Sequence, residues 1–153
     1  MDEEKAKAYV LRLIAKRAYT TGQIREKLAK KGAAPATADR LVSHFSRLGY
    51  LDDRLYAERF AEEKARKGYG PRWIEWALRL KRVDPKTIKE SVSGGGDGEA
   101  ARRALGASRL KMRSGEDPRR HAARLFSFLV RRGFSGSVSR AAVQKALRVD
   151  PED

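Results

Sequence analysis

The sequence predicts an all-α protein made of three tandem three-helix repeats, which stack into an elongated and curved array. Three observations lead to this prediction. Apolar residues recur at helical spacing throughout the 153 residues, Gly and Pro interrupt them at short intervals, and the chain aligns with itself at a shift of about 50 residues. Each repeat is too small to bury its apolar faces alone, so neighbouring repeats must pack on one another.

The first repeat is expected to occupy residues 1–50. Its first helix ends near Arg17 and has one apolar stripe, formed by Ala6, Tyr9, Val10, Leu13 and Ile14. Thr20 and Gln23 have the spacing of a capping box, in which each side chain satisfies a free backbone N–H of the other residue. This pattern predicts a second helix, which stops at Gly32.

Proline marks the start of the next helices. Pro35, Pro71 and Pro85 each stand where a first helical residue is expected, and proline is favoured there because its φ is already helical. The second repeat, residues 51–93, begins with a further helix that Asp52 caps.

The third repeat is expected to follow a Gly-rich linker at residues 94–98, because the run Ser-Gly-Gly-Gly-Asp-Gly has the composition of a flexible loop. The repeat spans residues 99–153 and closes with a short acidic tail. Its helices are predicted near residues 99–112, 118–132 and 137–147.

The self-alignment is strongest between the first two repeats. Residues 15–21 face residues 65–71, and the following apolar and cap positions Ile24, Leu28 and Pro35 face Ile74, Leu78 and Pro85. A shift of 101 residues pairs the first repeat with the third more weakly.

Charge indicates the class of partner. The chain has 35 Lys and Arg against 20 Asp and Glu, a formal net charge of +15, and this excess is spread over the whole sequence. Such a surface favours polyanions or acidic proteins. The absence of cysteine, of a long apolar run and of a basic start to the chain favours a cytoplasmic protein without membrane contact.

The sequence favours a binding protein over an enzyme. Asp52 and Asp53 are explained by helix capping, and the Gly run at 94–98 is not followed by the Lys-Ser/Thr of a phosphate-binding loop. His44 has no acidic or His neighbour at ligand spacing, and His121 directly follows two arginines, so both are interpreted as surface or packing residues. We therefore expect no catalytic residues, no cofactor and no metal.

A cluster of cations and aromatic rings around the connection near residue 69 is the main candidate binding surface. It consists of Lys64, Arg66, Lys67, Tyr69, Arg72, Trp73, Trp76 and Arg79. An alternative is that at least one Trp packs in the core, because Trp73, Ala77 and Leu80 share a helical face. A second basic patch consists of Arg119, Arg120, Arg124, Arg131 and Arg132.

Two segments of the sequence form recognisable motifs: Gly49-Tyr50-Leu51-Asp52-Asp53 and Ala65-Arg66-Lys67-Gly68-Tyr69-Gly70-Pro71-Arg72-Trp73-Ile74. Both motifs resemble those of the bacterial RecX family of RecA regulators. The likeness extends over about residues 5 to 147. It implies three three-helix repeats and binding in the groove of the RecA filament on single-stranded DNA. It further implies inhibition of the ATPase, strand-exchange and co-protease activities of RecA. Two features depart from the family pattern: Arg82 replaces the usual turn Gly, and residues 93–98 lengthen a connection.

The leading hypothesis is a RecA-filament inhibitor and modulator, acting in DNA repair and the SOS response. Its partners would be RecA and, weakly and without sequence preference, single-stranded DNA, with duplex DNA as a further option, and it would act as a monomer. The rival hypothesis is a stand-alone helix-turn-helix-like DNA-binding protein, since short basic three-helix units also describe that class. A small nuclease is a distant third.

Overall fold

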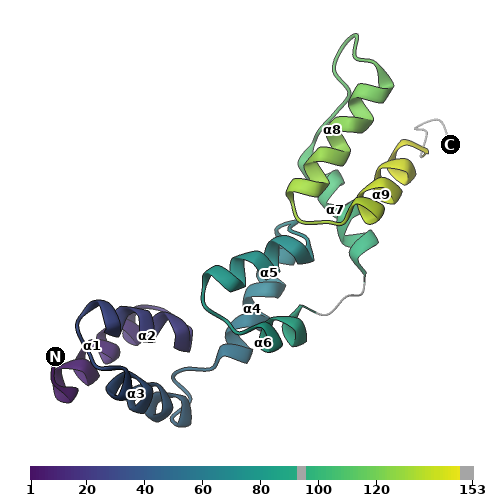
Figure 1. Ribbon diagram of the computed structural model, residues 1–153. Coiled ribbons are helices and arrows are strands. Elements are labelled where there is room, and N and C mark those ends of the chain that lie inside the picture. The colour runs from purple at the N-terminus through teal and green to yellow at the C-terminus, as the bar shows by residue number, and fades with distance from the viewer. Residues whose placement is uncertain (93–95, 149–153) are drawn as a thin grey trace. The chain divides into compact units, whose positions relative to one another are not determined.

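The computed structural model describes residues 1–92 and 96–148. Within these ranges the chain forms nine α-helices and no strand, which confirms the all-α prediction (Figure 1). The helices are α1 (Glu3–Lys16), α2 (Thr21–Lys30), α3 (Pro35–Arg47), α4 (Asp53–Arg66), α5 (Pro71–Leu80), α6 (Pro85–Ser91), α7 (Asp97–Ser108), α8 (Pro118–Arg131) and α9 (Gly136–Arg148).

Local sequence signals account for most helix starts. The capping box at Thr20 and Gln23 is present, with both reciprocal bonds formed. Asp52 accepts from the backbone N–H of Leu55 at 3.0 Å, and Asp84 accepts from that of Thr87 at 2.9 Å. Such bonds satisfy N–H groups that have no partner inside the helix.

The α7 region differs from the sequence-based expectation. Helix α7 begins at Asp97, so Asp97 and Gly98 lie in its first turn and not in a linker. It ends at Ser108 because Arg109 has a φ of 56°, which is incompatible with a continuing right-handed helix. Residues 94–95 of the expected linker and residues 149–153 of the expected acidic tail lie outside the described residues.

The chain divides into two compact units. One consists of Met1–Arg59 and Ala77–Ser91, and the other of Phe60–Trp76 and Val92–Asp153. The division passes through α4 and α5, so the compact units do not coincide with three-helix segments. The three-repeat division of the chain therefore stays a prediction.

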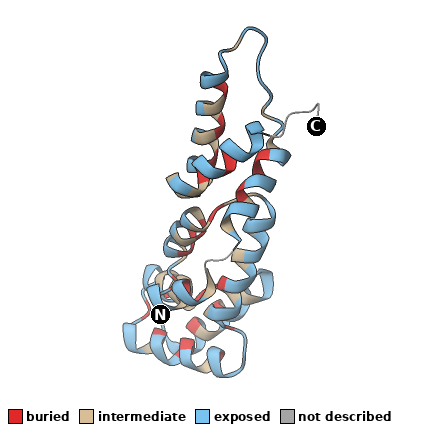
Figure 2. Cartoon of the chain, turned by 90° about the vertical axis from the view of Figure 1, so that its right-hand side faces the viewer, coloured by how far each residue is buried: buried red, intermediate tan, exposed pale blue. Residues whose placement is uncertain are grey.

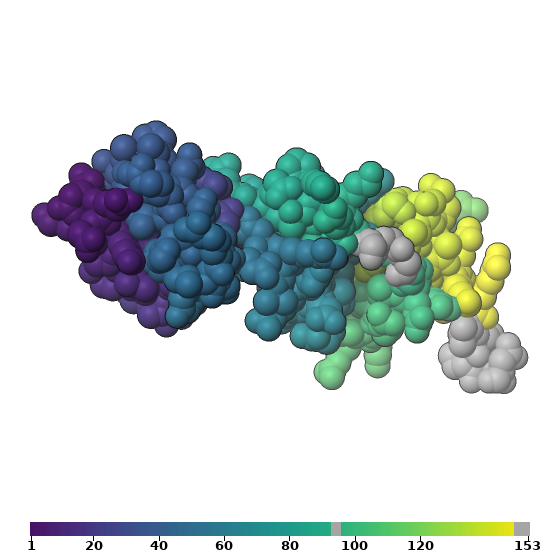
Figure 3. All heavy atoms as spheres, turned by 90° about the horizontal axis from the view of Figure 1, so that it is seen from below, coloured from purple at the N-terminus to yellow at the C-terminus, as the bar shows by residue number. Residues whose placement is uncertain are grey.

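Each unit has its own apolar core. In the first unit, helices α1–α3 enclose fully buried Val10, Ile24, Leu28 and Phe45, and the atoms of this region gather into one closely packed body (Figure 3). In the second unit the core of α7–α9 is centred on Leu129 and Phe134. Buried residues form stripes along the helices, with exposed residues on the opposite faces (Figure 2).

A close backbone contact joins α2 to the α5–α6 turn within the first unit. Thr20 is fully buried, and its hydroxyl donates to the carbonyl of Lys81 at 2.6 Å. A Cβ at Gly22 would overlap the Cβ and the carbonyl oxygen of Arg82. Arg82 has a φ of 63°, so it adopts the left-handed turn conformation at the position where the family resemblance led us to expect Gly.

The carboxylate of Asp53 strengthens this junction. It accepts from the Thr21 backbone N–H at 2.8 Å and from the Thr21 hydroxyl at 2.7 Å. The first turn of α4 is thereby bound to the first turn of α2. The sequence indicated a capping role for Asp53 but not this long-range partner.

The same kind of contact joins α5 to the α8–α9 turn within the second unit. The N–H of Gly70 donates to the carbonyl of Arg132 at 2.6 Å, and the N–H of Arg72 donates to that of Gly133 at 3.0 Å. A Cβ at Gly70 would lie 2.5 Å from the carbonyl carbon of Gly133. Gly133 itself has a φ of 100°, which only Gly adopts readily. The start of one helix thus lies directly on the backbone of a distant turn.

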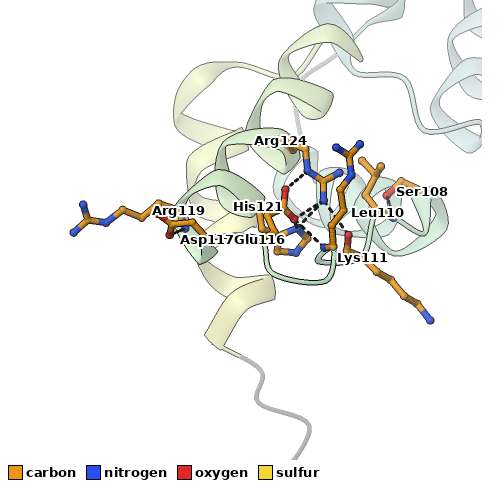
Figure 4. A network of polar contacts seen from close by, with 9 residues as sticks. Ser108, Leu110, Lys111, Glu116, Asp117, Arg119, His121 and Arg124 are labelled. Carbon is orange, nitrogen blue, oxygen red and sulfur yellow. Dashed lines mark hydrogen bonds and ion pairs between the residues drawn. The ribbon is translucent and has the colours of Figure 1, made fainter.

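A buried carboxylate holds the α7–α8 connection in place (Figure 4). The Glu116 side chain is only 4% exposed and accepts two bonds from Arg124, at 2.7 and 2.8 Å. It also accepts from the Arg113 N–H at 3.0 Å, and Arg124 donates to the carbonyl of Lys111 at 2.9 Å. The hydrogen bonds from Arg124 have the largest effect and the one from the Arg113 N–H the next largest, and together they lower the pKa of Glu116 to about 2.

The Gly70 contact predicts a specific sensitivity of the second unit. Gly70→Ala should lower the free energy of unfolding by about 1–3 kcal/mol, because the added methyl meets backbone that cannot rotate away. Gly136→Ala is the matched control, since its Cβ would meet nothing within 4 Å and Ala favours the start of α9. Urea unfolding followed by tryptophan fluorescence measures both variants, and equal stability of the two would contradict the close approach.

The Glu116 network predicts a pH dependence. Because the folded-state pKa of Glu116 lies below its ordinary value of 4.5, its contribution is fully present above about pH 4.5 and is lost as the pH falls toward 2. The urea midpoint of the native protein should therefore exceed that of Glu116→Gln at about pH 5, and the gap should narrow by about pH 2.5. Glu99→Gln, which removes an exposed pair with Arg103, should show no such narrowing. If the difference in urea midpoint between the native protein and Glu116→Gln stayed constant between these pH values, ionisation of Glu116 would not contribute to stability.

Candidate binding surface

Four aromatic side chains form a connected series in the second unit, and we refer to Phe60, Tyr69, Trp73 and Trp76 as the aromatic ridge. The rings of Tyr69 and Trp73 stack with centroids 3.9 Å apart, and Phe60 lies parallel to Trp73 at 6.3 Å. Trp76 is 6.2 Å from Trp73 and is 49% exposed. Trp73 is partly buried between Phe60 and Tyr69, whereas Trp76 lies at the surface. One Trp of the pair therefore packs against other rings and the other is exposed.

The α4–α5 connection places Tyr69 over Trp73. Gly68 has a φ of 91°, which reverses the chain after α4, and the N–H of Tyr69 then donates to the carbonyl of Lys64 at 3.0 Å. Pro71 starts α5 immediately afterwards. Two turns thus bring a ring from the connection onto a ring from the helix.

Cations lie over the rings of the ridge. The guanidinium of Arg132, at the C-terminal end of α8, lies 4.6 Å from the centroid of Tyr69 and 5.1 Å from that of Phe128. The Lys64 ammonium lies 5.5 Å from the ring of Phe60. Such contacts hold a cation at the surface without neutralising it. Arg132, from the second predicted patch, therefore meets residues of the first.

The first unit repeats this combination. Arg17 lies 4.3 Å from the ring centroid of Tyr19, and Lys27 lies 5.8 Å from it. Arg17 lowers the pKa of Tyr19, mainly by hydrogen bonding, against the opposing effect of burial. Tyr19 and Tyr69 occupy matching positions in the self-alignment at a shift of about 50 residues.

The other basic residues of the two predicted patches have different surroundings. Lys67 pairs with Glu63 at 3.0 Å, and Arg124 is bound to Glu116 in the network of Figure 4. Arg79 lies in the last turn of α5, in the first unit. The remaining members are exposed and form no ion pair with any described residue: Arg66, Arg72, Arg119, Arg120 and Arg131.

A cleft of about 200 Å³ opens beside Arg132, between the end of α4, α7 and α8. We refer to it as the alanine cleft, because Ala65, Ala100, Ala104 and Ala107 line it together with Phe128. Sequence reasoning overlooked Phe60, Phe128 and the cleft residue Arg103. Their helical periodicity is visible in the sequence, but it does not reveal that they meet Tyr69 and Arg132.

Two kinds of feature are absent from residues 1–92 and 96–148. No group of three or more His, Cys, Asp or Glu side chains is placed to hold a metal ion. No helix there combines the length and the apolar character that crossing a bilayer requires.

Comparison with known proteins identifies two three-helix domains in tandem. A family model described as the first three-helix domain of RecX matches residues 6–45, and one described as the second three-helix domain matches residues 52–92. Among solved structures, RecX from Lactobacillus salivarius has a TM-score of 0.80 at 17% identity, covering 94% of this chain and 95% of that one. This likeness shows that the two chains share the same fold.

Curated relatives are similar in sequence as well. The regulatory protein RecX of Thermus thermophilus is 42% identical over 87 residues, which span 57% of this chain and only 59% of that protein. The regulatory protein RecX of Mycobacterium leprae is 32% identical over 137 residues, covering 87% of this chain and 80% of that protein. The RecX of Halorhodospira halophila is 34% identical over 89% of this chain and 84% of that protein. With two family domains in tandem and relatives matched over most of their length, the chain belongs to the RecX family of regulatory proteins.

Proposed function

We propose that this protein regulates the RecA recombinase by binding the RecA filament on single-stranded DNA. Bound there, it inhibits or modulates the ATPase, recombinase and co-protease activities of RecA in DNA repair and the SOS response. The observation that carries the proposal is membership of the RecX family, together with relatives that are named regulatory proteins. The protein acts by binding in the cytoplasm, without a catalytic step of its own.

The charge distribution supports a filament as the partner. A filament of protein on DNA presents phosphates and acidic side chains together, and this chain has a net charge of +15. Broad positive charge accelerates encounter with such a surface and makes the affinity fall with salt. This contribution does not distinguish one polyanion from another.

The aromatic ridge supports a defined contact within that general attraction. Exposed Trp76, partly buried Trp73 and ring-bound Arg132 belong to the residue types that dominate binding energy at interfaces. Because Tyr69 and the α5 start are held by the Gly70 contact, these side chains are arranged before binding and lose little conformational entropy. A rigid anchor of this kind can hold adjacent RecA subunits in one arrangement.

Inhibition would follow from the space that the bound protein occupies on the RecA filament. Helices bound along a filament occupy space that a second DNA must enter, and they restrain subunits that must move during ATP turnover. Neither effect requires a nucleophile, an acid–base pair or a metal ion. The protein would therefore slow RecA at concentrations too low to coat the DNA.

The first test is the ATPase activity of RecA on single-stranded DNA, titrated with this protein below the RecA concentration, with binding to naked DNA measured at the same salt. We expect a strong fall in ATP hydrolysis at protein concentrations that leave naked DNA almost unbound. A fall that appears only once the DNA is coated, or tight binding to a duplex without RecA, would favour a stand-alone DNA-binding protein. No fall at any concentration would refute the proposal.

A charge-reversal variant tests the surface itself. Replacing Arg66, Lys67 and Arg72 by Glu should raise the concentration for half-inhibition about tenfold, equivalent to roughly 1.4 kcal/mol. The control reverses three exposed charges of the first unit instead: Arg47→Glu, Lys86→Glu and Lys89→Glu. The total charge change is identical, so an equal loss in both variants would show that only net charge matters.

A further inference from the structure

The alanine cleft combines a small apolar floor with a rim of cations. Arg66 and Lys67 come from the end of α4, Arg103 from α7 and Arg132 from the end of α8. None of the residues that line the cleft is acidic. Four positive side chains from three separate helical segments therefore surround one opening.

The ion pairs near the cleft leave these cations available. Lys67 and Glu63 have side chains that are 56% and 50% exposed, and the values for Arg103 and Glu99 are both 66%. Pairs with this exposure are weak and exchange readily with solvent or ligand. Arg66 forms no ion pair with any described residue.

Arg132 differs because its position is fixed. Its guanidinium lies against the rings of Tyr69 and Phe128, and Nη1 donates to the carbonyl of Lys67 at 3.4 Å. A guanidinium has five N–H donors, so most of its donors remain available for an anion. Fixed in this way, Arg132 presents a donor at the cleft without first ordering a flexible side chain.

The alanines keep the cleft open. Ala100, Ala104 and Ala107 come from successive turns of α7, and a longer side chain at any of them would enter the 200 Å³ of free space. The methyl groups cannot compete with a ligand for the surrounding N–H donors. A small, highly charged group fits this combination of space and charge better than a bulky apolar one.

We propose that the alanine cleft is a phosphate-binding site, taking either a free polyphosphate or the backbone phosphates of single-stranded nucleic acid. Several cations around one small space suit a group with more than one negative charge, or successive phosphodiesters, more than they suit a single carboxylate. The cleft shares Arg66 and Lys67 with the surface proposed to bind the RecA filament, but its phosphate binding can be measured without RecA. All the residues that line the cleft belong to the second unit.

Two adjacent arginines of α7 provide a matched pair of variants. Arg103→Gln removes a cleft cation, whereas Arg102→Gln removes an exposed charge from the preceding position, which does not line the cleft. Ala107→Leu fills the cleft without changing charge, at an exposed helical position that tolerates Leu. Each variant keeps the buried core of the second unit intact.

The measurement is isothermal titration calorimetry of the full chain with inorganic pyrophosphate and, separately, with a short oligothymidylate at several salt concentrations. We expect Arg103→Gln and Ala107→Leu to weaken the binding of at least one ligand about tenfold, with little change for Arg102→Gln. For the oligonucleotide, Arg103→Gln should also lower the slope of log affinity against log salt by about 0.7 per lost phosphate contact.

The two ligands distinguish the source of the phosphate. Selective weakening of pyrophosphate binding identifies a site for free polyphosphate, and selective weakening of oligothymidylate binding alone identifies a site for the nucleic-acid backbone. Equal behaviour of Arg103→Gln and Arg102→Gln, together with an unchanged Ala107→Leu, would overturn the proposal. Competition by polyglutamate as strong as that by pyrophosphate would overturn it as well, in favour of a carboxylate site. RecA is absent throughout, so the outcome is separate from the test of filament regulation.

Discussion

The contact between a helix start and a distant turn is the constraint on which both units depend. In the second unit, the N–H groups of Gly70 and Arg72 bond to the carbonyls of Arg132 and Gly133, with no room for a Cβ at either Gly. In the first unit, the side-chain hydroxyl of Thr20 donates to the carbonyl of Lys81, and a Cβ at Gly22 would overlap Arg82. The bonds of Gly70 and Arg72 satisfy backbone N–H groups at the start of α5, and the bond of Thr20 satisfies a carbonyl in the α5–α6 turn. Contacts of this kind explain why the compact units cut across α4 and α5.

The binding surface is built on the same contact. Arg132 uses its backbone carbonyl to hold Gly70 and its side chain to cover Tyr69, while Tyr69 stacks on Trp73. A change in the turn would therefore displace an anchor cation and two rings together. This coupling favours a preorganised surface, in which most of the ordering cost is met during folding. It also means that stability and binding cannot be altered independently at these positions.

Arginine residues with the same charge have different structural roles in this chain. Arg124 is bound to a nearly buried Glu116 and closes the α7–α8 connection, whereas Arg132 keeps its charge at the surface over two rings. Arg82 adopts a left-handed turn and pairs with Glu26 at 3.0 Å, so it belongs to the architecture of the first unit. The net charge of +15 describes long-range attraction, but the local partner of each guanidinium determines what that residue can bind.

The sequence by itself determined the nine helices of residues 1–92 and 96–148, most of their starts and the family, because caps, prolines and apolar periodicity are local signals within a few residues of one another. It also located the region around Tyr69 as a candidate surface. Only the tertiary structure decided that Arg132 contacts Tyr69, that Arg124 is bound to Glu116, and that Arg103 lines a cleft. Each of these facts depends on contacts between segments that are distant in sequence or on how helices pack. Periodicity shows which face of a helix is apolar, but it does not show which other segment lies opposite.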